Sequence, residues 1–400
     1  MFAVRVPLAV VGLCSLLTTV VVSDQQQTYI ADATKTLTKA LIKATAEDGF
    51  NYVASPFTSS VILALAAEGA EAETKNELIE ILGGNLPDKN TYKEILTSIK
   101  SYSSDGNFQN KLVLKNFLYV YKNYSVLESF ADLAREYYLT EVRSVNRPDL
   151  EIIRTANNDP NTPIDDDVTA FKEHAMLIFN GFSLDLSWPS STWHKTSVSW
   201  NGNVIRAFGA AGNFAIGQIS SLDSTVFKLP YKNTDYALLV ILPKNNANLG
   251  EVLKNLPKIG IKNMIETMSI KPGFVTMPCF QIRNITDLKT VLQEHTTVKS
   301  VFTESADLSK MSEDKLYLDG VVQQAGVRVC VGGSSSNSLT SSAFTSQRVI
   351  KESVVVDRPF AYALYNTVNG IMYVIGKVEQ PVWDEEDIVG EDSSIETIKM

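Results

Sequence analysis

Residues 332–348 read GGSSSNSLTSSAFTSQR, and this Ser-rich stretch decides how the chain is organised. A run of glycine and serine usually joins two domains flexibly. Here only about 35 residues follow before an acidic tail, which is too few for an independent hydrophobic core. The strands predicted after it, SVVVDRPFAYALY (353–365) and GIMYVIGKV (370–378), must therefore pair back into the preceding sheet system. The stretch is predicted to be a long exposed loop within one domain, and such loops are usually functional or disordered.

The composition of this loop suits both cleavage and insertion into a sheet. The loop contains no charge and no proline before Arg348, and in an extended segment Ser334, Ser336, Ser338 and Thr340 share one face. Such a segment can enter the middle of a sheet without burying a charge or losing a ladder hydrogen bond. A flexible, uncharged run that leads to a single arginine is also a favourable cleavage site for a trypsin-like protease.

The rest of the chain predicts an α+β fold in one domain. Predicted helices cover residues 29–48, 74–82, 126–138 and 287–295, one more begins at Ser55-Pro56, and strands cover residues 111–121 and 236–242. Helices dominate the first third and strands the remainder, and no regular βαβ repeat appears, which argues against a wholly parallel sheet. No internal repeat or linker divides the chain.

Both ends of the chain differ from the domain between them. Arg5 precedes an uncharged apolar run that ends in small residues at Ser23, so residues 1–23 are predicted to be a secretory signal peptide. The alternative is an N-terminal membrane anchor, for which a run of about 17 residues is short. Residues 384–400 carry seven acidic residues and one lysine, and are predicted to be a solvated, disordered tail. The domain therefore spans residues 24–383.

Export has consequences for asparagine and cysteine residues. In an exported protein, Asn123-Tyr124-Ser125 and Asn284-Ile285-Thr286 are candidate glycosylation sites. Removal of the leader leaves Cys279 and Cys330, which either pair in an oxidising compartment or remain as two buried free thiols. The mature protein is expected to be soluble and extracellular.

Charge and motif content argue against several classes of function. The net charge is −9 and the isoelectric point is about 5.1, which argues against binding to nucleic acid or to an anionic membrane. The three histidines lie far apart, so neither a metal site nor a cofactor is expected. The G-x-S-x-G, H-E-x-x-H, P-loop and dinucleotide motifs are missing, so the chain is not expected to be an enzyme.

Several segments of the sequence, taken in order, resemble the serpin family over residues 29–381. They are Ser55-Pro56 before an apolar helix, NFLYV (116–120), FKLPYK (227–232) with LLVILP (238–243), ADLS (306–309), VVQQA (321–325), Pro359-Phe360, and the final segment from Gly370 to Pro381. Each segment is a weak signal alone, whereas their order and spacing together are specific.

This resemblance implies a fold of about nine helices and three β-sheets with an exposed reactive loop near the C-terminus. A protease cleaves the loop, and the freed loop then inserts as a new strand in the central sheet and carries the acylated protease with it. The expected function is therefore that of a secreted, monomeric suicide-substrate inhibitor of a trypsin-like serine protease. The second hypothesis is a non-inhibitory serpin that acts as a protease substrate or a binding protein.

The resemblance also assigns residues. The scissile bond is Arg348–Val349 when it is counted back from Pro359-Phe360, and Gln347–Arg348 when it is counted from Gly333. The hinge of the loop comprises Gly332, Gly333, Ser334, Ser336, Ser338 and Thr340. Cys279 opens the strand beside the one that ends near Cys330, so a disulfide between neighbouring strands of the central sheet is expected.

Four features depart from the family pattern and favour the second hypothesis. Val331 stands where the hinge usually begins with glutamate. Ala175 and Ser183 replace an asparagine and a tryptophan of the family, and residues 150–170 lack the family's I-N-x-W-V helix motif. The small side chains of the hinge nevertheless leave insertion possible in principle, provided that buried hydroxyls find partners.

Overall fold

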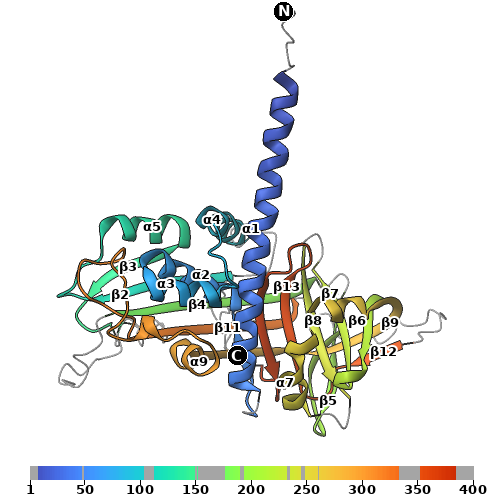
Figure 1. The fold of residues 1–400 in the computed structure, drawn as a ribbon. Coiled ribbons are helices and arrows are strands. Elements are labelled where there is room, and N and C mark those ends of the chain that lie inside the picture. The colour runs from blue at the N-terminus through green and yellow to red at the C-terminus, as the bar shows by residue number, and fades with distance from the viewer. Residues whose placement is uncertain are drawn as a thin grey trace, which may run out of the picture.

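The computed structural model describes residues 8–46, 49–102, 112–148, 151, 176–189, 193–231, 235–244, 248–259, 261–332 and 352–383. Residues 333–351, which include most of the predicted loop, most of residues 150–170 and the acidic tail lie outside the described residues. Within the described part, helices α2 to α5 gather at one end of the molecule, and strands β5 to β9 form the other end (Figure 1).

A five-stranded sheet lies beneath these helices. Its strands, in spatial order, are β10 (Phe280–Asp287), β11 (Gly320–Gly332), β4 (Met176–Pro189), β2 (Leu112–Tyr121) and β3 (Thr140–Val145). The β4–β11 and β2–β3 pairs are parallel, and the β10–β11 and β2–β4 pairs are antiparallel. The predicted strand over 111–121 is confirmed as β2.

The remaining described strands form one hydrogen-bonded sheet. They are β1 (Tyr52–Ala54), β14 (Met372–Val378), β13 (Phe360–Asn366), β8 (Tyr236–Pro243), β7 (Ser224–Pro230), β6 (Asn203–Ile219), β9 (Ser269–Pro278), β12 (Glu352–Val355) and β5 (His194–Trp200). Two sheets are therefore described where three were expected. The reason is the length of β6, whose first part pairs with β5 and β9 and whose last residues pair with β7.

Five of the eight described helices correspond to predicted ones, and α4, α7 and α8 were not predicted. They are α1 (Leu8–Thr45), α2 (Pro56–Gly69), α3 (Ala72–Ile81), α4 (Lys89–Tyr102), α5 (Glu128–Tyr138), α7 (Leu249–Ile259), α8 (Ile261–Glu266) and α9 (Leu288–His295). The predicted start at Ser55-Pro56 is confirmed, because the Ser55 hydroxyl accepts a hydrogen bond from the Thr58 amide at 3.2 Å and Pro56 is the first helical residue. Almost every residue of α2 is buried, so this helix lies in the core.

Two predicted elements differ from the structure. The strand predicted over 353–365 is divided into β12 and β13, which pair with different strands. Pro359 lies at the break and has no N–H for a ladder, while the Arg358 side chain donates a hydrogen bond to the Pro243 carbonyl at 2.7 Å. Helix α1 begins at Leu8 rather than near residue 29, and it continues through Ser23. The overall α+β prediction is confirmed.

Candidate functional site

The candidate site is the boundary between β4 and β11 in the five-stranded sheet. The two strands pair in parallel along all thirteen residues of β11, from Gly320 opposite Leu177 to Gly332 opposite Pro189. Parallel pairs are slightly less stable per residue than antiparallel pairs. A new strand could enter here only if β4 and β11 first separated. A segment that turned back after Gly332 would run antiparallel to both strands.

The end of this boundary from which the Ser-rich loop leaves, here called the loop-proximal end, contains the first residue assigned to the hinge. Gly332 is the last residue of β11 and lies opposite Pro189, the last residue of β4. Val331, which replaces the family glutamate, is buried and lies opposite Trp188. The remaining residues assigned to the loop lie outside the described residues; they are Gly333, Ser334, Ser336, Ser338, Thr340, Gln347, Arg348 and Val349.

A row of buried polar side chains crosses the sheet, one from each strand. In spatial order the row contains Thr286, Gln323, Asn180, Asn116 and Thr140, which are register partners and are at most 8% exposed. A buried polar group is costly unless it is hydrogen-bonded. Each side chain of the row therefore needs a hydrogen-bond partner, and no pattern in the sequence predicted this row.

Hydrogen bonds within this row join the two sides of the β4–β11 boundary. The side-chain amide of Gln323 donates to Asn180 Oδ1 at 2.7 Å, and the side-chain amide of Asn180 donates to Asn116 Oδ1 at 2.7 Å. The start of α2 is hydrogen-bonded to Gln323 and Asn180 as well. Thr58 Oγ1 donates to Asn180 Oδ1 at 2.7 Å, and the backbone amide of Ser55 donates to Gln323 Oε1 at 2.8 Å. Separation of β4 from β11 must break the Gln323–Asn180 bond.

Aromatic residues surround the loop-proximal end of β4. The Trp188 ring is 1% exposed and stacks on Tyr231 and Phe208, with ring centroids 4.5 and 5.4 Å apart. Burial, together with the nearby Asp185, raises the pKa of the Tyr231 phenol well above its usual value. Strand β4 therefore contains a buried tryptophan, Trp188, although Ser183 stands at the position where the family resemblance leads one to expect tryptophan.

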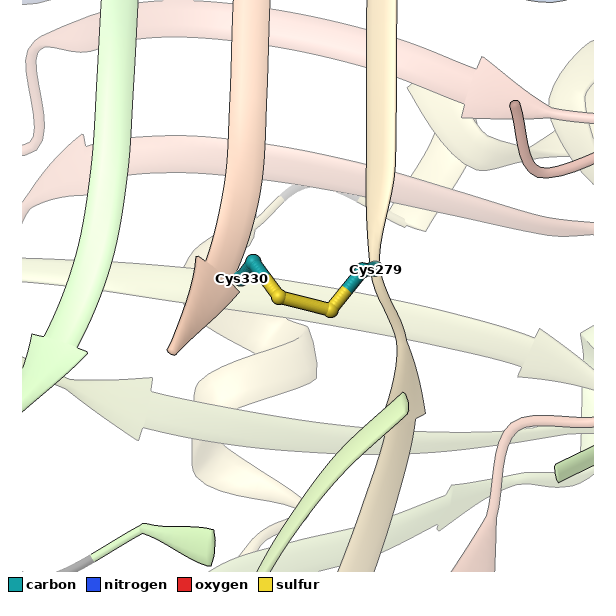
Figure 2. Close-up of a disulfide and its surroundings, with 2 residues drawn as sticks. All are labelled: Cys279 and Cys330. Atoms are coloured by element: carbon teal, nitrogen blue, oxygen red, sulfur yellow. A yellow bond between two sulfur atoms is a disulfide. The ribbon is translucent and has the colours of Figure 1, made fainter. Parts of the chain in front are cut away.

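A disulfide joins Cys279 to Cys330 on the other side of β11 (Figure 2). Cys279 directly precedes β10, and Cys330 lies two residues before the end of β11. Their Cα atoms are 4.7 Å apart, and both residues are buried. The bond therefore ties β10 to β11 at the end where the loop begins.

The last described residues lie against the same pair of strands. The Gln281 amide in β10 donates to the Val382 carbonyl at 2.7 Å. The Trp383 ring lies near two guanidinium groups, 4.4 Å from that of Arg328 in β11 and 5.1 Å from that of Arg206 in β6. This segment, residues 381–383, was not identified as functional in the sequence.

The two candidate glycosylation sites differ in environment. Asn123 is exposed in the turn that follows β2. Asn284 lies in β10 and is partly buried; its Oδ1 accepts from the Val53 amide at 2.7 Å, and its Nδ2 donates to Thr286 Oγ1 at 3.1 Å. Asn123 is therefore the more accessible of the two asparagines in the folded structure.

The described residues contain neither a metal-binding cluster nor a helix suited to crossing a membrane. No three histidine, cysteine, aspartate or glutamate side chains in this part of the chain are grouped so that they could hold a metal ion. None of the described helices combines the length and the apolar character needed to cross a membrane.

Comparisons with known proteins agree with this architecture. The family model for serpins, described as serine protease inhibitors, matches residues 30–381. The chain is 24% identical to an uncharacterised serpin-like protein of Thermococcus kodakarensis, over 90% of this chain and 88% of the relative, and 24% identical to neuroserpin of Gallus gallus, over 85% and 88%. The structure of mouse protein-Z dependent protease inhibitor superposes with a TM-score of 0.72 at 18% identity, covering 90% of this chain and 99% of that chain. This chain belongs to the serpin family, whose members are generally inhibitors of serine proteases.

Proposed function

We propose that the protein is a secreted suicide-substrate inhibitor of a trypsin-like serine protease. The observation that carries this proposal is the continuous β4–β11 boundary, which ends at Gly332 where the Ser-rich loop begins. The loop has one basic residue, Arg348, after an uncharged run without proline. An arginine side chain suits the acidic specificity pocket of a trypsin-like protease.

The proposed reaction uses the catalytic groups of the protease and none from this chain. The protease serine attacks the Arg348 carbonyl carbon, the bond to the Val349 nitrogen breaks, and Val349 leaves as a new amino terminus. Arg348 is then held to the protease as an ester. If the loop inserts before water reaches this ester, the protease remains attached. Gln347–Arg348 is the alternative bond.

Insertion between β4 and β11 would give the loop backbone two hydrogen-bonding neighbours. Residues 334–344 contain no charge and no proline, so each could take a place in the ladder. A buried hydroxyl without a partner costs about 1–3 kcal/mol, and the polar row between Asn180 and Gln323 offers donors and acceptors inside the boundary. The cleaved, inserted form should therefore be more stable than the intact form.

The remaining features of the proposal concern compartment and partners. Residues 1–23 are proposed to be a signal peptide that is removed during export, and residues 384–400 a solvated tail. The mature inhibitor is proposed to act extracellularly as a monomer, without a cofactor, and to bind neither nucleic acid nor membranes. Its net charge of −9 supports the last point.

A non-inhibitory serpin is the second candidate, and one observation favours it. Gln323 and Asn180 hold the β4–β11 boundary closed through buried hydrogen bonds that insertion must break. If this cost exceeds the gain from insertion, the cleaved loop stays outside the sheet and the protease hydrolyses its ester. The protein would then be a substrate or a binding protein.

Incubation with trypsin, followed by a denaturing gel, separates the two candidates. An inhibitor gives a covalent band near the sum of the two masses, whereas a substrate gives only a nicked chain. Arg348→Ala is the matched control, since it removes the proposed cleavage residue without touching the described fold. A nicked product without any covalent band would contradict the proposed inhibitory function.

A further inference from the structure

The pair Asn-Gly occurs three times in the chain, at residues 180–181, 201–202 and 369–370. This pair can lose the asparagine amide without any enzyme, because glycine has no Cβ to keep its backbone nitrogen from the side chain of the preceding asparagine. The reaction requires that this nitrogen and that side chain are free to meet. The three pairs lie in different parts of the structure, so the hydrogen bonds that hold these two groups differ among them.

In the Asn180-Gly181 pair, both reacting groups are held by the sheet. The Asn180 side chain is 0% exposed; it donates to Asn116 Oδ1 and accepts from the Gln323 side chain, each at 2.7 Å. Strand β4 lies between β2 and β11, so the Gly181 amide belongs to a ladder of backbone hydrogen bonds. Asn180 can therefore react only when this part of the sheet opens.

In the Asn369-Gly370 pair, both groups are also hydrogen-bonded, although the pair lies in the turn between β13 and β14. The Gly370 amide, which would be the attacking nitrogen, donates to the Asn366 carbonyl at 2.9 Å. The Asn369 side chain accepts from the Ile371 amide at 3.1 Å and donates to Gln27 Oε1 at 3.2 Å. The reaction is therefore slowed here by the bonds that must break before the two groups meet.

The Asn201-Gly202 pair forms the turn between β5 and β6, at the end of the molecule built from strands β5 to β9 (Figure 1). Its φ angles, 49° and 82°, are those of a two-residue hairpin turn that favours Asn-Gly, and both residues are exposed. Trp200 and Asn203 are the last register partners, so the Gly202 amide lies outside the ladder. In the part of the chain that the structure describes, the Asn201 side chain has no hydrogen-bond partner.

We propose that Asn201 is a site of spontaneous deamidation in the folded protein, and that the fold protects Asn180 and Asn369 from the same reaction. The Gly202 nitrogen loses its proton and attacks the side-chain carbonyl carbon of Asn201. A new N–C bond forms, the bond to the side-chain nitrogen breaks, and ammonia leaves with a proton. The cyclic imide then takes up one water molecule and opens at either carbonyl, to aspartate or to isoaspartate. This inference does not depend on the proposed inhibitory function.

The consequences differ between the products and between the sites. Both products add one negative charge to a chain whose net charge is −9. Aspartate keeps the backbone unchanged, and Asp-Gly also suits this turn. Isoaspartate carries the backbone through the side-chain carbon, which lengthens the turn and should disturb the register of Trp200 with Asn203. A carboxylate at Asn180 would do more damage, because it could not donate to Asn116 Oδ1.

The test is incubation of the native protein in mildly alkaline buffer, with mass spectrometry of its tryptic peptides at intervals. A matched sample unfolded in urea gives the rate of each pair without the fold. The native rate at Asn201 should lie within about tenfold of its unfolded rate, because exposed turns open locally at little cost in free energy. Asn369 should be slowed at least about tenfold by its hydrogen bonds. Asn180 should be slowed at least about 1,000-fold, because buried strands open at a large cost.

Two controls accompany the measurement. Asn203 is exposed and lies in the same tryptic peptide, residues 196–206, but the β-branched Val204 follows it, so it should stay unchanged. Asn201→Asp removes the amide and keeps a sequence suited to the turn, so its peptide should show no change in mass with time. The proposal is wrong if native Asn201 reacts no faster than native Asn369, or if none of the three pairs reacts in urea. Reaction of native Asn180 at its unfolded rate would refute protection by the fold.

Discussion

The two boundaries of strand β11 are built differently. The β4–β11 boundary is longer, parallel, and crossed by the Gln323–Asn180 hydrogen bond. The β10–β11 boundary is shorter, antiparallel, and closed by a disulfide at its loop-proximal end. Hydrogen bonds can break and re-form within a sheet, whereas a disulfide fixes the strand spacing. The difference teaches that the longer of the two boundaries is crossed by a side-chain hydrogen bond, whereas the shorter one is closed by a covalent bond.

The largest expected effect comes from the loop that would use this opening. Arg348→Ala should abolish the covalent complex with trypsin, because the acidic pocket of the protease loses its basic ligand. The fold should be unaffected, as judged by an unchanged unfolding temperature of the intact protein. A denaturing gel measures the complex.

The released C-terminal peptide of wild type locates the scissile bond. Mass spectrometry should find a peptide that starts at Val349. A peptide that starts at Arg348 would move the bond to Gln347–Arg348, and any other start would refute both assignments.

The next effect concerns the hydrogen bonds that close the β4–β11 boundary. Gln323→Met keeps the approximate shape of the side chain but leaves the Ser55 amide and Asn180 with one partner fewer. We expect a loss of about 1–3 kcal/mol in the free energy of unfolding of the intact protein. Chemical denaturation measures this loss.

A neighbouring variant provides the control for this measurement. Gln324→Met changes the same side chain one residue later, where it points to the opposite face of the sheet and is only partly buried. If Gln324→Met costs as much as Gln323→Met, the polar row does not hold the boundary.

Sequence signals predicted the elements whose cause is local. The N-cap at Ser55, the proline at position 56 and the continuously apolar strand β8 each act within a few residues. The polar row could not be predicted in this way, because Asn180 and Gln323 are far apart in sequence and meet only through strand register. The same holds for Trp383, whose partners Arg206 and Arg328 lie on two other strands.

The resemblance supplied what local patterns could not. The pairing partner of Cys279 depends on which strands are neighbours, and the residues alone left two buried free thiols as an alternative. By contrast, the sequence predicted one strand over residues 353–365, although Pro359 indicated the break between β12 and β13. The apolar residues on both sides of Asp357-Arg358 made the segment resemble one continuous strand.

A smaller effect tests whether the β10–β11 boundary is closed by a disulfide. Once residues 1–23 are removed, Cys279 and Cys330 are the two cysteines left in the sequence. Thiol titration of the unfolded, unreduced mature protein should therefore detect no free thiol, and reduction should release two. Two thiols before reduction would show that the β10–β11 boundary is not covalently closed.

The smallest effect concerns glycosylation of the two candidate asparagines. In a secreting eukaryotic host, Asn123→Gln should lower the mass of the protein by one glycan, since Asn123 is exposed. Asn284→Gln should leave the mass of the glycans unchanged, because Asn284 is partly buried in β10 and its side chain is hydrogen-bonded to Val53 and Thr286. Mass spectrometry before and after glycan removal measures both, and a glycan on Asn284 would contradict the second expectation.

The most direct test of loop insertion is thermal unfolding after cleavage of the loop near Arg348. Wild type should unfold at a higher temperature after cleavage, by about 10 °C or more, because the inserted loop completes ladder hydrogen bonds along β4 and β11. Ser334→Arg would place a charge under the sheet at the start of insertion, so the cleaved variant should gain little. If cleaved wild type unfolds at the same temperature as intact wild type, the loop does not enter the sheet and the account is wrong.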